Sequence, residues 1–213
     1  MDSLVLFGAG GHGKVLLDAA RAGGGRVLFC ADDDAARAGT VFCGLEVKPA
    51  AQLGSFCNCG NVALLNGIGY VGGRNVRAHV HARLTAGGWR FATVCHPAAV
   101  IAQDAVLADG VQVLAGAVVA PSVRVGVNSI INHRAVVDHD CVVGEHCHVA
   151  PGVTLCGGVR LGSGVFVGAG ATVVPGVSIG DGAVIGAGAT VLRHVSAGSV
   201  VAGTPAIPLA GNV

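Results

Sequence analysis

The second half of the chain carries an aliphatic residue at every sixth position. Sixteen such positions run from Ile101 to Val191 without an insertion, and each is Val, Ile or Leu. Four residues after each of them the side chain is small or β-branched, beginning at Ala105 and ending at Val195. A strict six-residue period is the signature of a parallel β-helix, whose stacked coils bury a continuous apolar column. We therefore expect a β-helix over this half.

A different pattern precedes the repeat, in which short apolar runs alternate with apolar residues at helical spacing. Strands are expected over residues 4–7, 26–30, 62–65 and 89–94, and helices over residues 14–22 and 74–84. This alternation predicts a small parallel sheet. We place the domain boundary at Cys95-His96-Pro97, which gives an α/β domain of residues 1–95 and a β-helix domain of residues 96–213.

Composition narrows the class of protein. Hydrophobic residues make up 52% of the chain, yet no apolar stretch approaches the roughly 18 residues of a membrane span, so we expect no membrane insertion. The net charge of +1 and the lack of Lys/Arg runs argue against a nucleic-acid partner. The opening Met1-Asp2 lacks the basic segment of a signal peptide, which favours a cytoplasmic location.

Cysteine usage points to reduced thiols. Eight cysteines occur, at positions 30, 43, 57, 59, 95, 141, 147 and 156. Their spacing fits no zinc ribbon or finger, and the pair Cys57-x-Cys59 alone is a weak signal. Without an export signal we expect free thiols. Cys141 and Cys147 fall on the small inward position of the repeat, so they are predicted to fill the core.

A glycine-rich loop joins the first expected strand to the first expected helix. Gly8, Gly10 and Gly13 match a dinucleotide-binding fingerprint, and acidic residues follow about twenty positions later. An NAD-dependent enzyme is one interpretation. However, fewer than 100 residues precede the repeat, so half a Rossmann unit that binds one nucleoside diphosphate fits better. The alternative is a turn that only packs helix on strand, although His12 within the loop favours a ligand.

The second candidate site is Asp138-His139-Asp140. His139 takes the third position of its hexapeptide, which projects outward, and stands between two carboxylates. An imidazole held by an acid is suited to general-base chemistry near neutral pH. Close in the sequence are Asn132, His133, His146 and His148.

A zinc site is the rival interpretation of the histidines. Trimeric β-helix carbonic anhydrases bind zinc through three histidines drawn from different coils and across a subunit boundary. The intervals between the four histidines here are six, seven and two residues, which are not diagnostic. We therefore expect no metal.

The chain resembles the left-handed β-helix acyltransferases with an N-terminal nucleotide-sugar domain, the PglD/NeuD-type sugar acetyltransferases of bacterial surface glycan pathways. The resemblance covers essentially the whole chain. It rests on residues 7–14, 95–100, 131–132, 138–149 and 203–206, which are FGAGGHGK, CHPAAV, IN, DHDCVVGEHCHV and GTPA. It implies three hexapeptides per coil, a left-handed β-helix, and a homotrimer with acetyl-coenzyme A (acetyl-CoA) in the groove between neighbouring prisms.

Site residues follow from the same resemblance. His139 matches the family's catalytic base and Asp140 the acid that orients it, where many relatives carry Glu, so Asp138 is kept as an alternative partner. His148 is implied near the thioester, Asn132 in the acetyl pocket, the N–H of Gly157 facing the thioester carbonyl, and Ala169 and Ala187 along the pantetheine arm. The positions implied beside the sugar nucleotide are Gly10, Gly11, His12, Gly13, Asp32 and Asp33.

The expected function is acetyl-CoA-dependent N-acetylation of a nucleotide-linked amino sugar, such as a 4-amino-4,6-dideoxy sugar. O-acetylation of sialic acid or a related nonulosonate would use the same His139, and the sequence does not separate an amine from a hydroxyl acceptor. Outside this class stand a trimeric zinc hydratase resembling carbonic anhydrase and a catalytically inactive scaffold. The intact His139-Asp140 pair argues against the scaffold.

Overall fold

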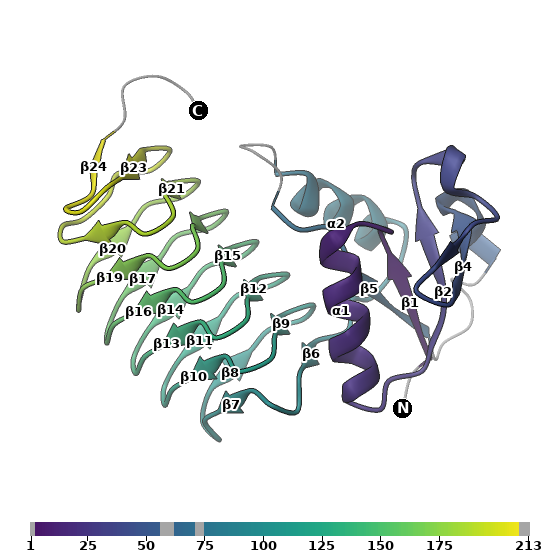
Figure 1. Cartoon of the computed structure of the whole chain (residues 1–213), viewed down its shortest axis with the longest axis horizontal. Helices are drawn as coiled ribbons and strands as arrows, with labels where there is room; N and C mark the ends of the chain where they lie inside the picture. Colours follow the sequence, from purple (N-terminus) through teal and green to yellow (C-terminus); the bar gives the residue numbers. More distant parts are fainter. Residues whose placement is uncertain (1–2, 56–61, 71–74, 209–213) are drawn as a thin grey trace.

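The computed structural model describes residues 3–55, 62–70 and 75–208. An α/β domain lies beside a three-faced prism of stacked coils (Figure 1). The prism is the parallel β-helix expected from the six-residue period, in the left-handed form that the family resemblance implies. Within the described part of the chain, no helix has the length and apolar character needed to cross a membrane.

The α/β domain is built on a five-stranded sheet with the order β3-β4-β2-β1-β5. Its strands are β1 (Ser3–Phe7), β2 (Val27–Asp32), β3 (Val41–Phe42), β4 (Leu45–Pro49) and β5 (Val62–Asn66). Strand β1 pairs in parallel with β2 and β5, and β2 pairs in parallel with β4. The parallel sheet is thus confirmed, while the antiparallel β3–β4 hairpin at its edge was not expected.

Two helices cover opposite faces of this sheet. Successive side chains of β1 point to opposite faces, so each helix packs on every second residue of the strand. Leu4 and Leu6 face α1 (Gly11–Ala22), while Val5 and Phe7 belong to the core shared with α2 (Val76–Ala86). Two short 3-10 helices, η1 (Ala35–Arg37) and η2 (Ala50–Ser55), lie beside β4. Helix α1 lies between the sheet and the prism (Figure 1).

Three expected boundaries differ from the structure. Helix α1 begins at Gly11 rather than residue 14, since Gly10 with extended backbone is its N-cap, so half of the expected glycine loop is helical. Helix α2 begins at residue 76, after the N-cap Asn75. Residues 89–94 form no continuous strand: Phe91 makes one bridge to Leu64, and a strand starts only at Val94.

The prism has three faces, each a parallel sheet that advances 18 residues per coil, as from Val118 to Val136. Face 1 contains β6 (Val94–Cys95), β9 (Gln112–Val113), β12 (Ile130–Ile131), β15 (His148–Val149), β18 (Phe166–Val167), β21 (Val184–Ile185) and β23 (Val200–Ala202), with β24 (Ile207–Pro208) antiparallel at its end. Face 2 contains β7 (Val100–Ile101), β10 (Val118–Val119), β13 (Val136–Val137), β16 (Thr154–Leu155), β19 (Thr172–Val173) and β22 (Thr190–Val191). Face 3 contains β8 (Val106–Leu107), β11 (Arg124–Val125), β14 (Val142–Val143), β17 (Arg160–Leu161) and β20 (Ser178–Ile179).

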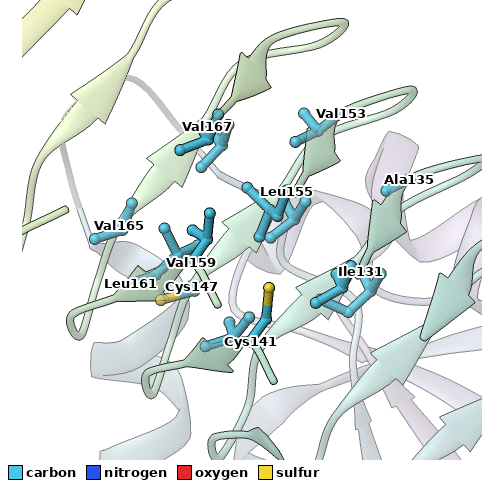
Figure 2. Packing of buried hydrophobic residues seen from close by; sticks show 14 of the residues in the cluster. Ile131, Ala135, Cys141, Cys147, Val153, Leu155, Val159, Leu161, Val165 and Val167 are labelled. Atoms are coloured by element: carbon cyan, nitrogen blue, oxygen red, sulfur yellow. The ribbon is translucent and has the colours of Figure 1, made fainter. Parts of the chain in front are cut away.

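The two periodic positions of the sequence form the core of the prism. The aliphatic residue ends each two-residue strand and points inward, and the small residue packs beside it from the preceding turn. Figure 2 shows Cys141 and Cys147 with their sulfurs among aliphatic side chains, and both are fully buried. Their predicted role as core filler is confirmed. Cys57 and Cys59 lie outside the described residues.

One backbone position per hexapeptide adopts a left-handed conformation. In the early and late repeats glycine fills it, as at Gly116 and Gly152. In five consecutive repeats between them the residues are Ser122, Asn128, Arg134, Asp140 and His146. A non-glycine residue with positive φ costs about 1–2 kcal/mol. The repeats that carry most of the candidate chemistry are therefore the ones that accept this strain.

Candidate active site

His139 lies in the turn between β13 and β14, at the corner where faces 2 and 3 meet (corner 2/3). Its Nδ1–H donates to Oδ2 of Asp140 at 2.8 Å. Asp138 instead accepts the backbone N–H of His139, also at 2.8 Å. The carboxylate that holds the imidazole is therefore that of Asp140. The backbone of Asp140 is left-handed, and from this position the short Asp side chain reaches Nδ1 of His139.

The hydrogen bond to Asp140 sets the protonation of His139. Because Nδ1 carries the hydrogen, Nε2 has a free lone pair and can accept a proton. The hydrogen bond that His139 donates to Asp140 and then the charge of Asp138 raise the pKa of His139 above 6.5. Its side chain is 61% exposed in the single chain, so substrate or a second copy of the chain can reach it.

Gly157 keeps the space beside His139 open. It occupies the same corner one coil further on, and the N–H of Gly158 donates to the carbonyl of His139 at 2.9 Å. A Cβ on Gly157 would lie 2.6 Å from Nε2 of His139. The N–H of Gly157 takes part in no backbone hydrogen bond with the described residues. Gly157 thus leaves open the space beside Nε2 of His139, and its own N–H is an unused donor next to that space.

A second group of candidate residues lies on face 1. Oδ1 of Asn132 accepts the backbone N–H of His133 at 2.8 Å, so its Nδ2 faces His148 and donates to Nε2 at 3.0 Å. His148 therefore carries its hydrogen on Nδ1, and this buried N–H has no partner among the described residues. Burial, together with His12 and Arg77, lowers the pKa of His148 to about 3. His148 is a neutral donor at physiological pH.

His12 joins this group from the first turn of α1. Its Nε2–H donates to Oε1 of Gln112 at 2.7 Å, and its ring lies 6.1 Å from that of His148. Burial and the charge of Arg77 lower its pKa to about 4. The sequence suggested that this imidazole of the glycine motif binds a ligand. In the structure its hydrogen-bond partner is Gln112 of the β-helix.

The glycines of the motif divide into two kinds. A Cβ on Gly13 would strike the carbonyl of Gly8, so Gly13 permits the close packing of α1 on β1. Gly10 and Gly11 are exposed, with nothing near the place of a Cβ. Their backbone amides lie at the N-terminus of α1, where the helix dipole favours the binding of an anion.

The two candidate acids after β2 are both engaged within the domain. Asp32 accepts the N–H of Ala9 at 2.7 Å and the N–H of Asp34 at 2.8 Å, so it fixes the glycine loop. Asp33 forms an exposed ion pair with Arg83 of α2 at 2.8 Å. Asp33 can exchange this partner for a ligand more readily than Asp32 can.

The candidate residues fall on opposite sides of one prism. Ala169 and Ala187 are exposed at the corner between faces 1 and 2, in the same column of turns as His133. The α/β domain covers face 1, where Leu16 and Leu17 of α1 share a core with Leu114 and Ile130. Corner 2/3, which holds His139, is opposite face 1 in a three-faced prism. No hydrogen bond between the described residues joins the two groups.

Four buried polar residues between the domains were missed at the level of sequence. Asn66, Arg77, Gln112 and Asn128 are each at most 4% exposed and are hydrogen-bonded to one another. A signal existed for Asn128, which interrupts the glycine pattern at the left-handed position. Arg77 lies in a helix with no local feature that marks it. Elsewhere, no three His, Cys, Asp or Glu side chains of the described chain converge as metal ligands would.

Three known families match parts of the chain. Residues 3–84 match the family described as the PglD N-terminal domain. Residues 158–193 match the bacterial transferase hexapeptide family, and residues 134–168 match the hexapeptide repeat of succinyl-transferase. The comparison with curated proteins finds no match.

Several solved structures are similar over nearly the whole chain. PerB from Caulobacter crescentus, in complex with CoA and GDP-perosamine, is 34% identical with a TM-score of 0.89, over 99% of this chain and 98% of its own. The acetyltransferase domain of PglB from Neisseria gonorrhoeae, in complex with acetyl coenzyme A, is 31% identical with a TM-score of 0.87, over 98% and 99%. WeeI from Acinetobacter baumannii is 25% identical with a TM-score of 0.87, over 97% and 99%. PerB and this chain are thus matched almost from end to end, with more than a third of the aligned residues identical. This protein therefore belongs to the family of PglD-type hexapeptide acyltransferases.

Proposed function

We propose that the protein transfers the acetyl group of acetyl-CoA to the amino group of a nucleotide-linked amino sugar, with His139 as the general base. The observation that carries this proposal is the Asp140–His139–Gly157 arrangement. It presents an unprotonated Nε2, oriented by a carboxylate, to a space that one glycine leaves open. The CoA and GDP-perosamine bound by PerB support the two substrate classes.

The reaction follows from these groups. The amino nitrogen attacks the thioester carbonyl while Nε2 of His139 takes its proton, so an N–C bond forms and the C–S bond then breaks. The imidazolium, stabilised by Asp140, returns the proton to the leaving thiolate, which gives free coenzyme A. The N–H of Gly157 is the unused donor suited to the developing oxyanion. No acyl-enzyme is required. Cys141 and Cys147 are buried, and the half-buried thiol of Cys156 has no hydrogen-bonded base among the described residues.

We further propose that the sugar nucleotide is bound by the α/β domain. Its diphosphate would lie at the N-terminus of α1 on the amides of Gly10 and Gly11, which are exposed. His12 and Gly13 would shape this turn, and Asp33 would face the nucleoside, with Asp32 holding the loop beside it.

The position of His139 supports a site shared between two copies of the chain. The α/β domain and His148 lie on face 1, and His139 lies at the opposite corner of the same prism. A sugar held by one α/β domain would therefore meet His139 of a neighbouring prism. A homotrimer satisfies this with three equivalent sites, each lined by Gly157 of one copy and by Asn132, His148, Ala169 and Ala187 of the next, with acetyl-CoA between them.

The test is coenzyme A release from acetyl-CoA in the presence of a panel of acceptors. The panel contains GDP-perosamine, UDP- and dTDP-linked 4-amino sugars, and free sialic acid. Turnover on an amino sugar is expected. Turnover on sialic acid alone would replace N-acetylation by O-acetylation.

The variant that tests the general base is His139→Asn, which keeps a polar side chain but removes the basic nitrogen. Its kcat should fall by about 10²–10⁴-fold, the usual contribution of a general base. His79→Ala, an exposed histidine of α2, is the control and should behave as wild type. Near-normal turnover of the His139 variant would refute the assignment of the base.

A further inference from the structure

Arg77 is a buried cation that pairs with no carboxylate among the described residues. It is 4% exposed. Its Nε donates to the carbonyl of Asn128 at 2.9 Å, and its Nη1 donates to the carbonyls of Asn66 and Ile68, each at 2.7 Å. Burial lowers its pKa to about 9, which still leaves it charged at neutral pH. Three carbonyl oxygens are thus the acceptors of a charge that is shielded from water.

These carbonyls belong to two different domains. Asn66 and Ile68 lie at the end of β5 in the α/β domain, whereas Asn128 lies at the corner between faces 3 and 1 of the prism. The planar guanidinium has donors fixed in a fork, so it can bond acceptors in both domains only in one relative position. The guanidinium of Arg77 is therefore a clamp across the domain boundary.

Three amide side chains complete the clamp. Nδ2 of Asn66 donates to Oδ1 of Asn128 at 3.1 Å. Gln112 of face 1 donates to the carbonyl of Asn66 at 2.9 Å and accepts from His12 at 2.7 Å. All of these amide groups are buried, so their hydrogen bonds are not exchanged easily with water.

The segment held by Arg77 touches the glycine motif. The N–H of Gly67 donates to the carbonyl of Phe7 at 2.7 Å. The side chain of Ile68 fills the place where Gly8 would carry a Cβ, and a Cβ on Gly69 would lie 3.2 Å from the Cβ of His12. A shift of this segment would therefore move the loop at the N-terminus of α1.

A merely structural contact would not require a charge here. Removing an ion from water costs several kcal/mol, and well-packed apolar residues commonly replace buried charges without loss of stability. An apolar side chain, however, forms no directional contacts. Only hydrogen bonds fix the distance and angle between the groups of the two domains. We infer that Arg77 is a positioning residue, which sets the place of the α/β domain, and of the sugar bound to it, relative to face 1.

This inference rests on the proposed function and predicts a separation of binding from catalysis. The groups proposed for acetyl-CoA are all on the prism, and those proposed for the nucleotide are on the α/β domain. Each ligand can therefore bind alone without an exact domain position. The reaction brings the two ligands together, and a misplacement of about 1 Å can reduce its rate about 10²-fold.

The experiment compares Arg77→Met and Arg77→Lys with wild type and with His79→Ala on the same helix. Binding of acetyl-CoA alone and of the nucleotide sugar alone is measured by calorimetry, and kcat by coenzyme A release. Arg77→Met should keep both Kd values within about threefold and lose kcat about 100-fold. Arg77→Lys should recover part of that loss, since an ammonium keeps the charge but not the fork. Unchanged kcat, or a Kd for the sugar that weakens as much as kcat falls, would overturn the inference.

A second variant and a second readout keep the test decisive. Gln112→Leu removes the bonds of Gln112 to Asn66 and His12 and leaves the Asn66–Asn128 bond in place. It should lower kcat about 10-fold, and it takes the place of Arg77→Met should that variant not fold. Should wild type be silent on every acceptor, the proposed function fails, and hydrogen exchange then decides the role of Arg77. Faster exchange at the hydrogen-bonded amides of Gly67 and Gly8 in Arg77→Lys, with the coils beyond Val149 unchanged, would support the clamp. Equal exchange would refute it.

Discussion

Replacing Gly157 by Ala tests the opening beside the proposed base. The backbone at this position tolerates a Cβ, because the equivalent turns of other coils carry Ala169, Ala187 and Ser163. Gly157 also has none of the positive φ values that demand glycine. The substitution therefore changes one thing, the space next to His139.

The size of the effect follows from the geometry. The added Cβ would lie 2.6 Å from Nε2 and 2.7 Å from Cε1 of His139. Ordinary carbon contacts begin near 3.5 Å, so the ring must move by roughly 1 Å or turn away from Asp140. Such a displacement costs about 10²-fold in rate, which is about 2.7 kcal/mol of transition-state stabilisation. Stability should change little, because the His139 ring is exposed and free to move.

The assay is coenzyme A release at saturating substrates, with thermal unfolding measured on the same samples. We expect kcat of Gly157→Ala to fall at least 100-fold while Tm stays within about 2 °C. Ser163→Ala changes the same turn position at another corner and should leave both values unchanged. The backbone N–H of residue 157 is kept in the variant, so a loss of rate reports on His139. A Gly157→Ala protein with kcat within threefold of wild type would refute the orientation derived for the imidazole.

Two further predictions concern protonation. Asp140 raises the pKa of His139 above 6.5, so activity should fall as pH drops through that raised value, and Asp140→Asn should move this acidic limb of the kcat profile to lower pH while lowering its plateau. An unchanged limb would mean that another group titrates. His12 and His148 have lowered pKa values of about 4 and about 3, whereas the unfolded chain protonates them near 6.5, so stability is lost as pH falls below 6.5. Each should remove about 2 kcal/mol of unfolding free energy between pH 7 and pH 5, and urea unfolding of His148→Asn should show a pH dependence smaller by that amount.

The prism was predictable because its signal is local and repeated. Each coil contacts only its neighbours, so the six-residue period from Ile101 to Val191 predicts which side chains point inward and which point outward. The outward placement of His139 and the burial of Cys141 follow from the same count. The edge hairpin was not predictable, since β3 has only two residues and, unlike the strands of the prism, is not marked by any repeat.

The surroundings of the candidate residues required the structure. The sequence offered both Asp138 and Asp140 as partners of His139, and only the left-handed backbone at residue 140 directs that carboxylate to Nδ1. The tautomers of His12 and His148 depend on amide partners far away in the chain, Gln112 and Asn132. Arg77 gave no signal, because its three acceptors are backbone carbonyls and any residue type supplies those.

The strained turns show how a regular solenoid makes room for chemistry. Glycine at the left-handed position is free of strain but places no side chain at the corner. Where the corner must hold an acid against His139, or an amide against Asn66, Asp140 and Asn128 replace glycine. Asp and Asn tolerate this conformation better than other residues do. The coils beyond Gly152 return to glycine, since their corners contribute surface and backbone rather than side chains. The interruption of the glycine pattern is thus a sequence feature that separates the coils whose side chains are proposed to react from those proposed to line the site with backbone and small residues.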